Sequence, residues 1–353
     1  MCVIVAKHFK DIGWVLAKNR DRSYKPLIHI KQSYRDEVER LYIYDSDTKY
    51  TEGLNEYGIC IISSTFAVKD EMERDLVAKD EDGSSDGKKI RTALLEKTAD
   101  KAIKKLIELQ ATGCTLITTK TECYVLEGCF PSRVAETSEE HTANKIDVIS
   151  RIGGKIIIHD MSNYKHKLQK VKKDEFVVRT NHGVLIEDAG YSKKLAKDLG
   201  DEKMNKSSES SYARREKVLS LIKGAKDIEQ LLEVLSNKDD KNEQLNPLRT
   251  TDRHGKNVMV TTGQLVLNPG ELTLSYRNIW SDVNFDHNKL DAPDKKTSFE
   301  VVSSKKLLSL KEFLELKEEK KIFNNTEEFT TFFVDKYNSA IEIWGSEAII
   351  HDL

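Results

Sequence analysis

The chain opens with Met1-Cys2-Val3-Ile4-Val5-Ala6 and continues, after a polar break, as Gly13-Trp14-Val15-Leu16-Ala17-Lys18-Asn19-Arg20-Asp21. Both runs are apolar and rich in strand-forming residues, and Asp11-Ile12-Gly13 between them is typical of a tight turn. The pattern predicts a hairpin whose second strand ends beside the start of the first. We therefore expect Lys18 and Asp21 to lie near Cys2.

Cys2 directly follows the initiator methionine, and cysteine is small enough for that methionine to be removed. The new terminus would combine a thiol of pKa about 8.5 with an α-amine of pKa about 7.7 to 8.0, and the amine can accept the thiol proton. Such a residue is a nucleophile with its own base, so no catalytic histidine is required. The alternative is that Cys2 is simply an early residue of a buried strand.

Length, composition and charge limit the class of protein. The 353 residues are 38% hydrophobic and 33% charged, as in a globular protein of one or two domains. The 57 basic and 59 acidic residues leave no excess charge for nucleic acid or an acidic membrane surface. No apolar run approaches the roughly 20 residues that cross a bilayer, and no cleavable signal begins the chain. We expect a cytoplasmic protein without nucleic-acid or membrane partners.

Cysteine usage and motif content indicate neither a metal nor another cofactor. The number of cysteines is odd and none forms a CxxC pair, so neither a disulfide framework nor a zinc site is predicted. Walker, Rossmann and His-Glu-x-x-His patterns are absent from the sequence. The sequence does not decide between a monomer and a homo-oligomer. The five cysteines are Cys2, Cys60, Cys114, Cys123 and Cys129.

Asn55-Glu56-Tyr57-Gly58 leads into a continuous apolar run, which predicts a tight turn followed by a strand covered on both faces. The end of this strand, Ser63-Ser64-Thr65, becomes small and polar, which suits a strand that runs into a site. Polar residues 67–87 then predict a loop over a pocket, and residues 90–109 have helical spacing.

The rest of the chain alternates strand and helix patterns. Asn181 follows a strand and is either a turn former or a site residue, whereas a histidine such as His182 in a turn is more often structural. Ser210 and Ser211 suit a helix start, which would place Arg214 in a first turn, where a cation opposes the helix dipole. Further strands are expected at 114–119, 122–127, 146–149, 155–159, 175–180, 258–267 and 271–277, and helices at 226–236, 304–318 and 326–344. We predict one domain over residues 1–280 and a helical extension over 281–353 packed on it.

Taken in order, these pieces resemble the choloylglycine hydrolase and penicillin V acylase-like group of N-terminal nucleophile hydrolases. The motifs are Cys2, Lys18-Asn19-Arg20-Asp21, Asn55-Glu56-Tyr57-Gly58, Thr180-Asn181, and Ser210-Ser211-Tyr212-Ala213-Arg214, with a closing hairpin from Thr261 to Arg277. The sequence departs from the group at two positions. Lys18 stands where the group has arginine, although Arg20 is close by, and Thr65 stands where the group often has asparagine.

The resemblance implies an α+β fold of four layers, αββα, in which two antiparallel sheets are stacked between helices. It implies that Cys2 is the nucleophile and that Asp21 holds its ammonium group. A cation at Lys18 or Arg20 would favour the thiolate. Asn181 would donate to the oxyanion, Arg214 would orient the other groups, and Thr65 would contact the substrate.

The resemblance also implies an activity. We expect an amidase that cleaves a linear carbon-nitrogen bond of a small N-acyl substrate through a Cys2 acyl-enzyme. Two alternatives remain: an acyltransferase that passes the acyl group to an amine, and an inactive member that binds an acylated ligand. The substrate cannot be read from the sequence, because variable loops would line the pocket.

Overall fold

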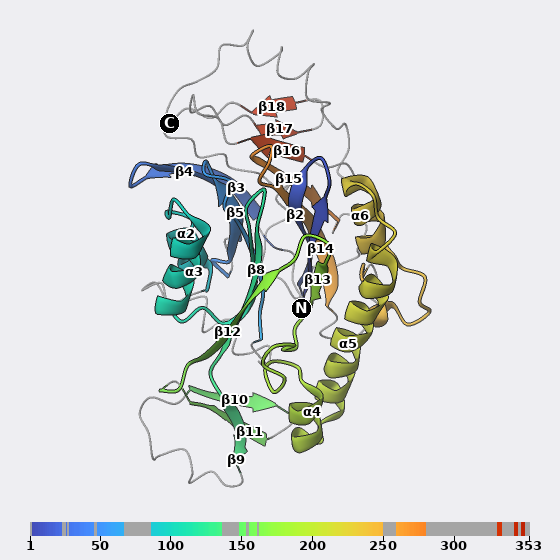
Figure 1. The fold of residues 1–353 in the computed structure, drawn as a ribbon. Coiled ribbons are helices and arrows are strands. Elements are labelled where there is room, and N and C mark those ends of the chain that lie inside the picture. The colour runs from blue at the N-terminus through green and yellow to red at the C-terminus, as the bar shows by residue number, and fades with distance from the viewer. Residues whose placement is uncertain are drawn as a thin grey trace.

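Two β-sheets lie face to face in the computed structural model, with helices on the outer side of each (Figure 1). The structure describes residues 2–22, 26, 28–45, 48–66, 86–135, 148–152, 155–160, 162–249, 259–279, 330–333, 342–344 and 347–349. The order of layers is helix, sheet, sheet, helix. This confirms the four-layer αββα fold class.

The first large sheet contains the N-terminal hairpin. Its strand order is β13-β1-β2-β14-β15-β16, and neighbouring strands are antiparallel. The predicted hairpin is confirmed, because Cys2 pairs with Arg20 and Phe9 with Gly13. The strands are β1 (Cys2–Phe9), β2 (Gly13–Arg22), β13 (Phe176–Arg179), β14 (Val260–Asn268), β15 (Thr273–Asn278) and β16 (Thr330–Phe333).

The second large sheet has the strand order β12-β8-β7-β6-β5-β4-β3. Its strands are β3 (Ile28–Arg35), β4 (Val38–Asp45), β5 (Thr51–Asn55), β6 (Cys60–Ser64), β7 (Gly113–Thr118), β8 (Cys123–Cys129) and β12 (Lys165–Val171). A small sheet joins β10 (Val148–Ile152), β11 (Lys155–His159) and β9 (Ser132–Ala135), and β17 (Glu342–Trp344) pairs with β18 (Glu347–Ile349).

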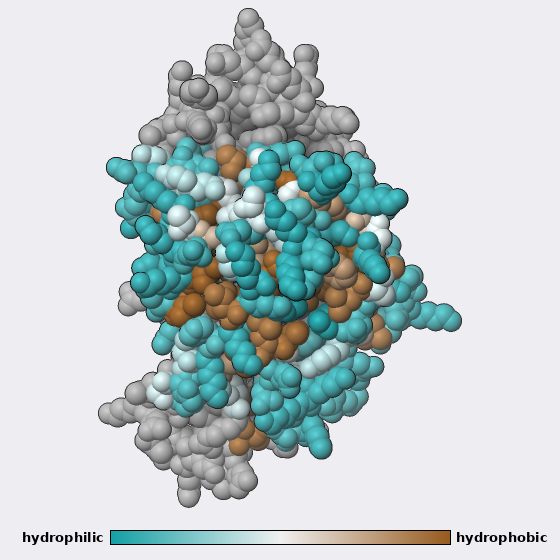
Figure 2. Space-filling model, viewed as in Figure 1, coloured by the Kyte–Doolittle hydropathy of each residue, from teal (hydrophilic) through white to brown (hydrophobic). Residues whose placement is uncertain are grey.

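Three hydrophobic clusters hold the layers together. The cluster between the sheets includes Ile4, Leu16 and Val125. A second packs the outer face of the β3–β12 sheet against α2 (Asp86–Ala93) and α3 (Ala99–Glu108), and a third packs the β1–β2 sheet against α5 (Glu202–Ile222) and α6 (Ile228–Leu235). The described residues also form helix α4 (Lys193–Leu199) and the 3-10 turn η2 (Glu243–Leu245). On the face shown in Figure 2, a hydrophobic band crosses the middle of the molecule between hydrophilic margins.

Alternation along the strands decides which residues face which layer. Ile4 and Leu16 belong to the cluster between the sheets, whereas Val5 and Ala17 belong to the cluster under the helices. Successive side chains of a strand point to opposite faces. The even-numbered residues of β2 therefore face the second sheet, and the odd-numbered ones face the helices.

Several predicted elements differ from the structure. The helix predicted over 90–109 is two helices, α2 and α3, separated at 94–98. The helix expected from Ser210 begins at Glu202, where Asp201 caps it by accepting from the Met204 amide. Arg214 thus lies in the helix interior, and the first-turn argument for it was wrong.

The predicted C-terminal helix over 326–344 is wrong where the structure describes it. Residues 330–333 and 342–344 are strands, and β16 gains backbone partners from β15. Such pairing can override a helical pattern in the sequence. The segments 67–85 and 304–318 lie outside the described residues, and the division at residue 280 stays a prediction. None of the helices in the described ranges is long and apolar enough to span a membrane.

Candidate active site

Cys2 is the first residue of β1, an interior strand between β13 and β2. Only 3% of Cys2 is exposed. It pairs directly with Arg20. Because side chains two apart share a face, Lys18, Arg20 and Arg22 all lie on the Cys2 side of β2, toward the second sheet. The end of the N-terminal hairpin therefore places a thiol among three cations.

Arg22 is the cation in contact with the thiol. Its Nη1 donates to Cys2 Sγ at 3.6 Å and to the Asp21 carbonyl at 2.9 Å. Its Nε donates to Asp45 Oδ2 at 3.4 Å. The guanidinium also lies 5.5 Å from the centre of the Tyr50 ring. Several independent contacts thus fix the direction of this side chain.

Lys18 and Arg20 are held by carboxylates from the second sheet. Lys18 Nζ forms a short ion pair with Glu52 and donates to the Ser63 carbonyl at 2.6 Å. Arg20 Nη2 lies 3.3 Å from Asp45 Oδ2, and its Nε lies 3.9 Å from Glu52 Oε2. These four side chains are fully buried. Buried charges need such pairing, because removing them from water is costly.

Asp21 projects from the opposite face of β2, toward the helix layer. Its Oδ2 accepts from Arg214 Nη1 at 2.9 Å, and its Oδ1 accepts from Thr261 Oγ1 at 2.9 Å. Arg249 Nη1 lies 3.5 Å from Oδ2. Asp21, Arg214 and Arg249 are each 0% exposed. The Asp21 carboxylate thus joins strand β2 to α5 and to the segment before β14.

Asn181 connects the two sides of the site. Its Oδ1 accepts from the Cys2 backbone nitrogen at 2.8 Å and from Arg214 Nη2 at 3.4 Å. Its Nδ2 donates to the Thr65 carbonyl at 3.0 Å. The backbone nitrogen of Asn181 donates to Ser211 Oγ at 3.1 Å, which ties the end of β13 to α5.

Cys2 is chemically unlike the other cysteines. Burial raises the pKa of its thiol, but the positive charges around it, Lys18 first and then the chain's amino terminus and Arg22, bring that pKa down to about 7. Burial raises the pKa of Cys60 well above its usual range, and raises that of Cys129 to about 11. Of these thiols, only Cys2 has a substantial thiolate fraction at neutral pH.

The structure brings all the predicted site residues together in one contact network. Cys2, Thr65, Asn181, Arg214 and Asp21 form a chain of hydrogen bonds, and Lys18 and Arg20 lie on the Cys2 face of β2. His182 is a structural residue: it stacks on Tyr212 with ring centres 3.6 Å apart. Its Nδ1 lies 2.9 Å from Ser211 Oγ.

Four charged residues of the network were not predicted from the sequence: Arg22, Asp45, Glu52 and Arg249. Arg22 had a usable signal, because it follows Lys18 and Arg20 at the two-residue period of a strand. Glu52 stands three residues before the Asn55 turn and could be assigned to the site only once the second sheet was placed. Arg249 lies in an irregular segment with no sequence signal. Within the described ranges, no group of three or more histidine, cysteine or acidic residues could hold a metal ion.

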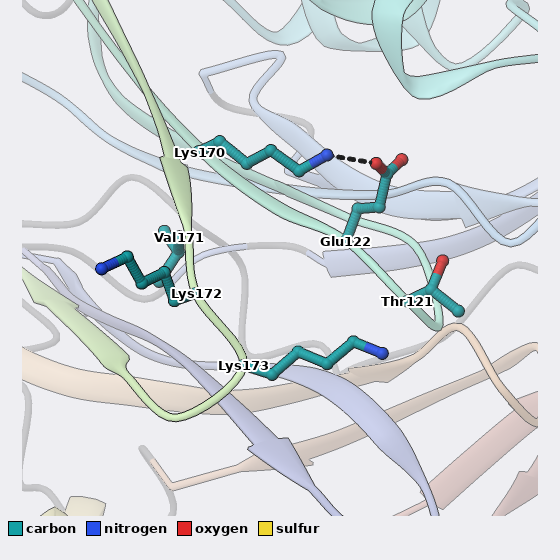
Figure 3. A pocket seen from close by; sticks show the side chains of 6 residues that line it. All are labelled: Thr121, Glu122, Lys170, Val171, Lys172 and Lys173. Atoms are coloured by element: carbon teal, nitrogen blue, oxygen red, sulfur yellow. Dashed lines mark hydrogen bonds and ion pairs between the residues drawn. The ribbon is translucent and has the colours of Figure 1, made fainter.

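A surface hollow lies at the other end of the sandwich (Figure 3). Its volume is about 590 Å³. The β7–β8 turn that helps to line it lies beside the far end of the N-terminal hairpin, since Trp14 donates to the Lys120 carbonyl. Cys2 stands at the opposite end of β1, so this hollow is separate from the site. It is lined by Thr121, Glu122, Lys170, Val171, Lys172 and Lys173.

Comparisons with known proteins found similarity at the level of structure. No family model and no curated protein matches the chain. Penicillin V acylase from Agrobacterium tumefaciens is similar with a TM-score of 0.40 and 9% identity, covering 78% of this chain and 83% of that one. Two variants of conjugated bile acid hydrolase from Clostridium perfringens have TM-scores of 0.37 and 0.36 at 12% identity, covering 78% and 79% of this chain and 89% of theirs. The fold assignment rests on the layers and strand order described above.

Proposed function

We propose that the protein is a cysteine amidohydrolase that cleaves a linear carbon-nitrogen bond of a small N-acyl substrate, with Cys2 as its N-terminal nucleophile. One observation carries the proposal. The thiol of Cys2 has a pKa of about 7, while the nitrogen of the same residue is held by Asn181 at 2.8 Å. A nucleophile and its base would then be one residue once Met1 is removed.

The reaction would begin with proton transfer from the Cys2 thiol to its own α-amine. The sulfur electron pair then forms a bond to the substrate carbonyl carbon, and the carbonyl electrons move onto oxygen. When this intermediate collapses, the carbon-nitrogen bond breaks and the leaving amine takes the proton from the Cys2 ammonium. Water resolves the thioester by the same steps and releases a carboxylic acid.

The neighbours of Cys2 suit these steps. The side-chain amide nitrogen of asparagine carries two hydrogens. Asn181 Nδ2 donates one of them to the Thr65 carbonyl, so the other remains available for an oxyanion. A donor of this kind is typically worth about 2.7 to 4 kcal/mol in the transition state. Arg214 bonds both Asp21 and Asn181, so it would keep Oδ1 of Asn181 directed at the Cys2 nitrogen.

Activity against a panel of N-acyl amino acids and penicillin V tests the proposal. We expect release of free amine by the wild-type protein, and none by Cys2→Ala. Cys129→Ala is the matched control, because this second thiol lies outside the site and should leave turnover unchanged. Intact mass should show that the active species lacks Met1, since the mechanism needs a free α-amine.

Three outcomes would contradict parts of this proposal. Activity retained by Cys2→Ala would remove Cys2 as nucleophile. Full activity with an uncleaved N-terminal tag would remove the self-activating mechanism. Formation of an N-acyl product in preference to acid, when an amino acid is added as acceptor, would indicate an acyltransferase.

A further inference from the structure

The Cys2 face of β2 gathers three cations and two carboxylates close to the Cys2 sulfur. Lys18, Arg20 and Arg22 contribute three positive charges, whereas Glu52 and Asp45 contribute two negative ones. All are fully buried except Arg22, whose side chain is 12% exposed. Close charges in a dry environment interact far more strongly than in water. In such a setting, a cation in contact with the Cys2 sulfur favours the thiolate.

We propose that Arg22 is a catalytic residue, which holds Cys2 as a thiolate in the resting protein through the contact between Nη1 and Sγ. The assignment rests on the proposed function, because it concerns the same nucleophile. Lys18 is the largest favourable charge on the Cys2 thiol, but Arg22 is the cation that donates to the sulfur. The sequence expectation placed the activating cation at Lys18 or Arg20. Those two side chains point their charged atoms at Glu52, Asp45 and the Ser63 carbonyl.

The geometry separates Arg22 from the other two cations. Its Nη1 reaches both Sγ and the Asp21 carbonyl, and Asp45 holds its Nε from the far side. The guanidinium is therefore fixed before any substrate arrives. Arginine stays protonated at all relevant pH values, so Arg22 supplies a constant charge and exchanges no proton.

The proton balance follows from this arrangement. The thiol proton moves to the α-amine, which gives a thiolate beside Arg22 and an ammonium group beside Asn181 Oδ1. Attack on the carbonyl uses the thiolate electron pair, and the departing amine takes the proton held by the ammonium. Arg22 donates a hydrogen bond to sulfur throughout the resting state and releases it as the new carbon-sulfur bond forms.

Other charged and titratable groups surround Cys2 and must stay constant in any test. Burial raises the pKa of Tyr50 well above its usual range, so this neighbour is neutral. The groups facing the site are the α-amine, Lys18, Arg20 and Asp21 from the hairpin, Asp45, Tyr50 and Glu52 from the second sheet, and Arg214 and Arg249 from the helix side. A test should therefore change Arg22 or its anchor alone.

The pH profile of Cys2 alkylation by iodoacetamide provides the test. Peptide mapping follows the rate at Cys2, with Cys129 in the same protein as the reference thiol. For Arg22→Gln we expect the midpoint to rise by about 1 pH unit, the lower end of the effect of one adjacent charge. The rate at pH 7 should fall about fivefold, as the thiolate fraction drops from one half to roughly one tenth.

Two further variants make the result independent of any one substitution. Arg22→Lys keeps the charge and should restore most of the shift. Asp45→Asn removes a negative neighbour but leaves Arg22 in place, so the midpoint should move downward. Arg215→Gln is the control: it removes an arginine of α5 that bonds the Val178 carbonyl, and the midpoint should stay unchanged.

The proposal is overturned if folded Arg22→Gln keeps the wild-type midpoint, whatever the midpoint of Asp45→Asn. Alkylation needs no substrate, so its outcome is distinct from that of the amidase assay. A protein that shows the midpoint shifts but hydrolyses nothing contradicts only the proposed function. A protein that hydrolyses substrates without the shifts contradicts only the role of Arg22.

Discussion

Strand β2 has two halves that are equally buried and differ in chemistry. Trp14 to Ala17 are 0% exposed and apolar, and Lys18 to Asp21 are 0% exposed and polar or charged. The apolar half contributes the hydrophobic stabilisation expected of a core strand. The polar half must be compensated by partners from the second sheet, from α5 and from the segment before β14. One strand thus serves as core at one end and as a charged site at the other.

The polar half of β2 contributes less to stability than an apolar strand of the same burial would. Burial of an ion pair is often no better than burial of apolar residues, but removal of one partner is strongly destabilising. The polar half of β2 therefore tolerates single changes poorly. Its retention makes sense if the charges act on Cys2, which pairs with this half of the strand.

The largest effect should follow loss of the Asp21 carboxylate. Asp21→Ala leaves Arg214 and Arg249 facing each other without their shared anion, and we expect it to lower the free energy of unfolding by about 3 to 5 kcal/mol. Leu16→Ala in the apolar half should cost about 2 to 5 kcal/mol through a cavity. Urea denaturation measures both. A cost below about 1 kcal/mol for Asp21→Ala would mean that the polar half is not held by pairing.

A smaller but more specific effect is expected at Asn181. Asn181→Ala should lower kcat by about 10² to 10³, since both the donor for the oxyanion and the acceptor for the Cys2 nitrogen are lost. Asn55→Ala is the matched control: this buried asparagine closes a turn by accepting from the Tyr57 and Ile59 amides. It should lower the melting temperature with kcat unchanged. If Asn181→Ala lowered the melting temperature and left kcat unchanged, Asn181 would not be a site residue.

A further effect concerns pH and His182. Burial, with the positive charges of Arg215 and Arg214, lowers the pKa of His182 to about 3. The unfolded histidine binds its proton near pH 6.5 and the folded one does not, so stability should fall as the pH drops from about 6.5 toward 3. The slope for one proton is at most about 1.4 kcal/mol per pH unit.

Thermal melts between pH 7 and pH 4 measure this loss, and His182→Gln provides the comparison. The variant keeps a polar side chain but cannot titrate, so its stability should depend less on pH than that of the wild type. Parallel curves for the two proteins would show that His182 is not the group responsible.

Local patterns predicted much of the fold and of the site. The hairpin, the Asn55 turn and the helix at 226–236 follow from residue spacing and turn chemistry. Strand β12 could not be predicted from alternation, because Lys165 to Lys170 are all exposed along a sheet edge. Pairing with β8 supplies the backbone hydrogen bonds that its side chains do not predict.

The unpredicted part of the site consists of partners that come from distant segments. Arg249 and Glu52 bond the polar half of β2 only because the layers bring them there. No local pattern in the chain carries that information. Arg22 is the exception, since its position follows from the strand period once the hairpin register is known.

The position of β1 inside its sheet has a consequence for biosynthesis. The first strand to leave the ribosome pairs with β13, and the Asp21 carboxylate bonds Thr261, which is 240 residues further along the chain. At translation rates of about 5 to 20 residues per second, those 240 residues take roughly 12 to 48 seconds to appear. For that time the nascent chain carries a β2 edge that still lacks its partner β14, with the charged end of β2 beside it. The contacts around Cys2 and Asp21 cannot all form until synthesis has nearly reached β15.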